Sequence, residues 1–181
     1  MTRKQFLLSV PLAASVMRGA DTTRKAPELV LTDTNGKQIR LSLLRGKVVV
    51  LEFMLTTCPH CRDTARLLSR LQEEYGQEGF QAISLPFNDD AVTAAPRFVA
   101  DYQVTHPVAP IQRERAYEFA QLSAVILHTV PIVVFIDRRG RIRAQFEGKD
   151  GFFRNEEANF RATILELLKE PAPSPSGGHA H

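Results

Sequence analysis

The chain contains only two cysteines, and both stand in the sequence Cys58-Pro59-His60-Cys61. An apolar, β-branched run from Val48 to Leu55 precedes them, and a helical pattern follows from about Thr64 to Tyr75. A helix N-terminus carries roughly half a positive charge and unpaired N–H groups, which favour a thiolate on the first cysteine. A structural disulfide is a weak explanation, because so short a loop constrains the unfolded chain very little. The pattern therefore predicts redox chemistry, with Cys58 as the nucleophile and Cys61 as the resolving thiol, and leaves metal binding as an alternative.

The elements that must position this pair alternate between strand and helix. The run Val48–Leu55 has the composition of a strand buried on both faces. Before it, Glu28–Leu41 contains an Asp33-Thr34-Asn35-Gly36 turn and predicts a β-hairpin. The later predicted elements are a strand Phe80–Leu85, a helix Ala94–Tyr102 capped by Asn88–Asp90 with Pro96 in its first turn, a strand Pro107–Ile111, a helix Arg115–Gln121, strands Ile132–Ile136 and Arg141–Glu147, and a last helix beginning at Asn155. This order predicts an α/β sandwich, with room for a complete helix-strand insertion between Cys61 and Pro131.

These residues resemble the thioredoxin superfamily, and more narrowly its extracytoplasmic thiol-disulfide oxidoreductases, over about residues 26–170. The opening Ala26–Lys37 and the segment Leu41–Lys47 are similar to the TlpA/ResA redoxins. The active-site sequences Leu51-Glu52-Phe53 and Cys58–Cys61, together with Val130-Pro131, resemble disulfide oxidases of the DsbA type. The resemblance implies a thioredoxin-like three-layer sandwich with an N-terminal β-hairpin and an insertion before a cis-proline. It also implies disulfide exchange with exported proteins, without a cofactor or a bound metal.

The same resemblance implies roles for four further residues. Glu52 occupies the position of the buried acid of thioredoxin-type enzymes and is expected to exchange a proton with Cys61, through water if needed; the alternative is a carboxylate solvated at the strand end. His60 is expected to stabilise the thiolate, or else to be only a spacer. Pro131 corresponds to the cis-proline, and the exposed backbone of Val130 would pair with an extended substrate chain.

Two sets of features favour opposite directions of exchange. His60 and the start of the helix favour an oxidant, because a stabilised thiolate stabilises the reduced enzyme, and Val130 before the proline also resembles the oxidase. The N-terminal hairpin and the central insertion are typical of reductases of the cytochrome-maturation type. We expect the local residues to dominate and the enzyme to act as an oxidant, with the periplasmic reductase as the alternative.

Two other classes stay open as further alternatives. A copper-binding module could use the two cysteines and a distant histidine, although copper-delivery relatives of this fold space their cysteines one residue wider. A thiol peroxidase of this fold would carry Thr where this chain has Leu55. His106 and His128 are interpreted as ordinary loop histidines.

The two ends of the chain differ from its middle. Met1 to about Ala20 is typical of an export signal, because Arg3 and Lys4 precede an apolar segment too short to span a bilayer comfortably. Cleavage after Ala20 is expected, with Ala13-Ala14-Ser15 as an alternative. Residues 171–181 are rich in Pro, Ser and Gly and are predicted to be disordered. We therefore expect an exported protein, periplasmic or otherwise extracytoplasmic, that is anchored if the leader is uncleaved.

Composition narrows the class of partner. A chain of 181 residues with 44% hydrophobic content suits one domain. Arg3, Lys4 and Arg18 are three of the 23 basic residues, so the rest of the chain holds 20 basic against 20 acidic residues. A nucleic-acid partner is not expected, since a basic footprint should belong to the folded domain. The expected partners are protein thiols and disulfides and a membrane redox partner that recycles the pair, and the protein is expected to be a monomer.

Overall fold

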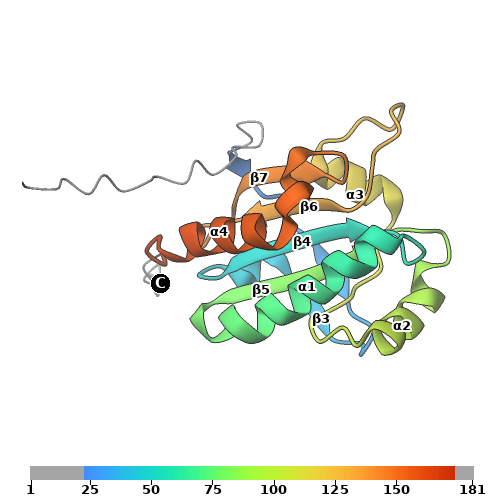
Figure 1. Cartoon of the computed structure of the whole chain (residues 1–181), viewed down its shortest axis with the longest axis horizontal. Coiled ribbons are helices and arrows are strands. Elements are labelled where there is room, and N and C mark those ends of the chain that lie inside the picture. Colours follow the sequence, from blue (N-terminus) through green and yellow to red (C-terminus); the bar gives the residue numbers. More distant parts are fainter. Residues whose placement is uncertain (1–22, 174–181) are drawn as a thin grey trace, which may run out of the picture.

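The central strand β4 (Val48–Met54) is buried along its whole length, as its unbroken apolar run predicts. It pairs in parallel with β5 (Phe80–Pro86) and antiparallel with β6 (Ile132–Ile136). The sheet continues through β7 (Arg141–Glu147) to the short β1 (Arg24–Lys25), which the sequence did not predict. The structure is a computed structural model that describes residues 23–173 (Figure 1); the expected export signal and residues 174–181 lie outside the described residues.

Helices cover one face of this sheet, and a helix with a hairpin covers the other (Figure 1). Helices α1 (Pro59–Tyr75) and α4 (Glu156–Leu168) pack on the side of β4 that carries Val48 and Val50. The hairpin of β2 (Val30–Thr32) and β3 (Gln38–Arg40) packs with α3 (Arg113–Ala120) on the opposite side. Short 3-10 helices lie at Leu41–Leu44, Gly76–Glu78 and Gly151–Asn155. The predicted three-layer sandwich with an N-terminal hairpin is confirmed.

The insertion between α1 and β6 departs from the prediction in detail. Helix α2 (Ala91–Tyr102) begins three residues earlier than expected, so Pro96 lies in its second turn and not in its first. Asp90 is at the N-cap, but its side chain makes no capping hydrogen bond. The predicted strand over residues 107–111 is wrong: the segment makes one isolated bridge, from Val108 to Ser84. Pro107 on this segment and Pro86 on β5 explain this, because neither has the N–H that would extend the ladder on either side of the bridge.

The active-site helix follows its predicted pattern. Thr64, Leu68, Leu71 and Tyr75 are all buried, and together they form the face that α1 turns to the sheet. Among residues 23–173, no helix is both long enough and apolar enough to cross a membrane. The fold therefore places the N-terminus of α1 at the end of β4, where the two cysteines stand.

Candidate active site

The two cysteines differ sharply in exposure. Cys58 is the N-cap residue of α1 and is half-buried, and its Sγ accepts a hydrogen bond from the backbone N–H of Cys61 at 3.3 Å. Cys61 lies inside the first turn and is completely buried. Pro59 takes the first helical position, where its missing N–H costs nothing. A substrate can therefore reach Cys58 but not Cys61, which is the geometry of a nucleophile with a resolving thiol.

Glu52 is also completely buried, so the alternative of a solvated carboxylate at the strand end is wrong. Its neighbour across the parallel pair β4–β5 is Ser84, whose hydroxyl donates to Oε2 at 2.6 Å. The other oxygen, Oε1, has no hydrogen-bond partner among the described residues. Burial raises the pKa of Glu52 from 4.5 to about 8; the hydrogen bond from Ser84 opposes this rise, and the charge of Glu156 adds to it.

The thiol of Cys61 is held in its protonated form. Burial raises its pKa first, and the negative charge of Glu52 raises it further. The negative charge of Glu52 therefore favours the protonated form of the Cys61 thiol. An ionised Glu52 can accept the proton that this thiol must lose before it attacks.

His60 faces a carboxylate from another element. Its Nε2 lies 3.8 Å from Oε2 of Glu156 on α4, and its ring meets the ring of Phe153 edge-on at 4.9 Å between centroids. Glu156 also accepts a hydrogen bond from the hydroxyl of Thr64, and burial raises its pKa. A positive charge on His60 would thus be shared with Glu156 and not reserved for Cys58.

The structure brings the predicted proline loop to the cysteines. The peptide bond between Val130 and Pro131 is cis. The side chains of Val130 and Cys58 both pack against the apolar cluster that contains Cys61. Gly148 supports this loop closely: its N–H donates to the carbonyl of Thr129 at 2.8 Å, and a Cβ built on it would lie 2.5 Å from the carbonyl oxygen of Val130.

Sequence reasoning missed two histidines. His106 is not a solvated loop residue but is buried, with Nε2 2.7 Å from the hydroxyl of Ser84 and Nδ1 3.1 Å from that of Ser69. His128 is fixed between Glu147 and the carbonyl of Ser123, at 3.1 and 3.0 Å, directly before the proline loop. A polar Ser84 between Ile83 and Leu85 was the one available hint of the first network.

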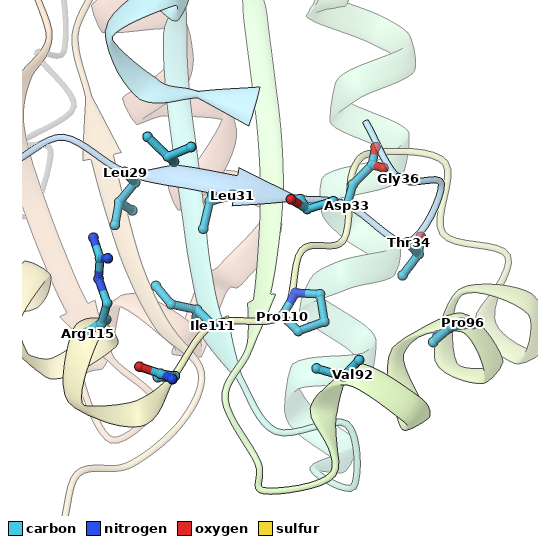
Figure 2. A pocket seen from close by; sticks show the side chains of 13 residues that line it. Leu29, Leu31, Asp33, Thr34, Gly36, Val92, Pro96, Pro110, Ile111 and Arg115 are labelled. Carbon is cyan, nitrogen blue, oxygen red and sulfur yellow. The ribbon is translucent and has the colours of Figure 1, made fainter. Parts of the chain in front are cut away.

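The described surface also contains a groove of about 660 Å³ away from the cysteines. It lies between the hairpin and the segments that carry Val92 on α2 and Pro110 and Ile111 beyond it (Figure 2). Neither cysteine and no residue of the proline loop lines it. Within residues 23–173, no three His, Cys, Asp or Glu side chains gather in an arrangement that could hold a metal ion. The two cysteines of the candidate site therefore lie outside this groove.

The comparisons with known proteins agree with this chemistry. A sequence profile of the family described as Redoxin matches residues 21–164. The chain belongs to the redoxin family. This redoxin is 30% identical over 126 residues to the thiol-disulfide oxidoreductase ResA of Bacillus cereus (strain ATCC 10987), covering 70% of this chain and 69% of the relative. It is 29% identical over 128 residues to ResA of Bacillus subtilis (strain 168), covering 71% and 66% of the two chains.

Solved structures show the same fold. A putative thiol:disulfide interchange protein DsbE from Chlorobium tepidum superimposes with a TM-score of 0.69 at 25% identity, covering 82% of this redoxin and 98% of that chain. A putative protein disulfide isomerase from Bacteroides thetaiotaomicron gives a TM-score of 0.67 at 26% identity, covering 81% and 89%. This redoxin is a thiol-disulfide oxidoreductase of the ResA/TlpA type.

Proposed function

We propose that this redoxin reduces disulfides of exported proteins, so that the reductase alternative replaces the oxidant expected from Cys58-Pro59-His60-Cys61. The ResA relatives support this direction, because the N-terminal hairpin and central insertion of the TlpA/ResA layout are typical of reductases of the cytochrome-maturation type. The observation that carries the proposal is the buried carboxyl group of Glu52, whose negative charge raises the pKa of the Cys61 thiol, together with Glu156, which lies 3.8 Å from His60. Nearby negative charge disfavours a thiolate, destabilises the reduced enzyme and makes the dithiol a better reductant.

The proposed reaction uses the difference in exposure between the two thiols. The Cys58 thiolate attacks a substrate disulfide, forms a mixed disulfide with one substrate sulfur and releases the other as a thiolate. The Cys61 thiol then gives its proton to Glu52 and attacks the Cys58 sulfur. The second substrate thiolate leaves, the substrate disulfide has been reduced, and Cys58 and Cys61 have been oxidised to a disulfide.

A polypeptide substrate suits the surface around Cys58. The loop that leads into the cis-proline exposes three consecutive apolar side chains, of which Val125 is 95% and Leu127 is 92% exposed. The backbone of Val130 would pair with an extended substrate chain, as the family resemblance implies. Apolar side chains of that chain would contact the loop while its disulfide lies at Cys58.

Export completes the proposal. The leader with Arg3 and Lys4 would place the enzyme outside the cytoplasm, where disulfides form and persist. Each turnover leaves a Cys58–Cys61 disulfide, so a membrane redox partner must supply electrons to regenerate the dithiol. Fusion of residues 1–25 to a reporter active only outside the cytoplasm should give activity that is lost when both basic residues become acidic, and a reporter that stays cytoplasmic contradicts export.

The direction is tested by equilibration against glutathione buffers, with the dithiol fraction measured by alkylation and mass spectrometry. We expect a reduction potential near the thioredoxin end of the range, about −270 mV. A value near about −120 mV would instead show that the enzyme is an oxidant. Glu156→Gln should raise the potential, because it removes a negative charge beside the pair. The matched control Glu118→Gln, an identical change at an exposed position of α3, should leave the potential unchanged.

A further inference from the structure

A chain of buried polar side chains leads away from Glu52. Ser84 Oγ lies 2.6 Å from Glu52 Oε2 and 2.7 Å from His106 Nε2. His106 Nδ1 lies 3.1 Å from Ser69 Oγ, which also lies 3.1 Å from the carbonyl oxygen of Ala65. Glu52, Ser84, His106 and Ser69 are all buried and come from β4, β5, the loop after α2 and α1. Four separate segments therefore converge on one carboxylate.

The single hydroxyl hydrogen of Ser84 and the neutral ring of His106 determine which atoms donate in this chain. The Ser84 hydroxyl has one proton and donates it to Glu52 Oε2, so the same oxygen can only accept from His106. Nε2 of His106 must therefore carry a hydrogen. Burial lowers the pKa of His106 to about 3, so the ring is neutral and Nδ1 is an acceptor. The Ser69 hydroxyl has one proton to share between the carbonyl oxygen of Ala65 and Nδ1, each at 3.1 Å, and Ser69 Oγ accepts from the backbone N–H of Thr105 at 3.2 Å.

The tautomer of His106 affects how readily Glu52 ionises. If the other tautomer were present, Nε2 would accept and would compete with Glu52 for the single proton of Ser84. Hydrogen bonds that point toward a carboxylate favour its ionised form, and a chain of donors strengthens each member. The Ser84 bond occupies Oε2 and leaves Oε1, the oxygen without a partner among the described residues, to take a proton.

We propose that His106 is a positioning residue: acting through Ser84, it keeps Glu52 able to ionise and to accept the proton of Cys61. The inference rests on the proposed role of Glu52 in resolving the mixed disulfide. The titratable groups that interact with Glu52 or with its hydrogen-bond chain are the protonated Cys61 thiol on α1, Glu156 on α4 and the neutral His106. Burial and the charge of Glu156 oppose ionisation of Glu52, so the hydrogen bond from Ser84 is the contact that favours it.

Two measurements on the full-length dithiol protein test this inference directly: the tautomer of His106 and the titration of Glu52. Nitrogen-15 NMR should show His106 with hydrogen on Nε2 and not on Nδ1 when Glu52 is ionised. Carbon-13 NMR of the Glu52 carboxyl should show its pKa rising by about one to two units in Ser84→Ala, and by less in His106→Leu. His106→Gln, whose amide can donate from nearly the same place as Nε2, should restore a value close to that of the wild type.

Kinetics separate positioning from a merely structural effect. The pH profile of mixed-disulfide resolution should move to higher pH in Ser84→Ala and in His106→Leu, whereas a structural defect would lower the rate equally at every pH. Thr163→Val is the matched control, because Thr163 is buried and bonds to a helix carbonyl as Ser69 does but lies outside the chain. An Nδ1–H tautomer, or an unmoved Glu52 titration in Ser84→Ala, overturns the inference. If the Glu52 titration shifts in Ser84→Ala but Glu52→Gln resolves the mixed disulfide at the normal rate, only the proposed proton transfer is refuted.

Discussion

Replacing Glu52 by Gln should change how stability depends on pH. The folded-state pKa of Glu52 is raised from 4.5 to about 8, so between these values the folded protein keeps a proton that the unfolded chain has lost. Stability contributed by this group is complete below pH 4.5 and is lost as pH rises through about 8. The loss amounts to about 1.4 kcal/mol for each pH unit, or about 4–5 kcal/mol over the whole interval. Against a typical total of about 5–15 kcal/mol, this is a large effect.

His106 affects the pH dependence of stability in the opposite direction to Glu52, so the two contributions must be separated. Its folded pKa is lowered to about 3, so its contribution is present above the unfolded value of 6.5 and is lost as pH falls toward about 3. The two slopes nearly cancel in the wild type between about pH 4.5 and 6.5. In Glu52→Gln only the contribution of His106 is left. The free energy of unfolding of the variant should therefore increase as pH rises over that range, while that of the wild type should not.

The assay is urea unfolding of the dithiol protein at several pH values from 5 to 8. The free energy of unfolding of Glu52→Gln minus that of the wild type should increase by about 1.4 kcal/mol per pH unit. A buried amide that lacks a partner adds an offset of about 1–3 kcal/mol, but this offset does not depend on pH. The exposed control Glu118→Gln should run parallel to the wild type. Parallel profiles for Glu52→Gln would refute the raised pKa and the reasoning built on it.

Three further predictions concern the exchange reaction. Cys61→Ser should trap substrates as mixed disulfides through Cys58, whereas Cys58→Ser should trap few, as counted by mass spectrometry of captured proteins; equal trapping would reverse the two roles. His60→Gln should lower the reduction potential by less than about 30 mV, because the ring faces a carboxylate of α4, and a larger drop would show that His60 acts mainly on the thiolate. Gly148→Ala should destabilise the protein by about 1–3 kcal/mol and raise KM for a peptide disulfide, because its Cβ would lie 2.5 Å from a backbone oxygen of the proline loop. In Gly76→Ala the nearest atom, at 2.7 Å, belongs to a flexible side chain, so a similar loss there would point to a general effect of the added methyl group.

The sequence alone determined the redox pair and most of the frame around it. The helix after Cys58, the buried strand Val48–Met54 and the N-terminal hairpin follow from residue patterns within short stretches of chain, where local spacing and turn chemistry decide the structure. The apolar strand favoured burial of Glu52, but only the structure excluded a carboxylate solvated at the strand end. The segment 107–111 was mispredicted, because its apolar residues suggested a strand, while Pro107 and the facing Pro86 lack the N–H groups of a full ladder.

Only the tertiary structure decided what surrounds the reactive groups. Glu52 meets Ser84 because β4 and β5 pair in one register, and a shift of one residue would turn the hydroxyl to the other face of the sheet. His60 meets Glu156, which lies almost a hundred residues later on α4. The proton affinities of Glu52 and Cys61 depend on burial and on charges brought from separate elements, and these are properties of packing that no local sequence pattern contains.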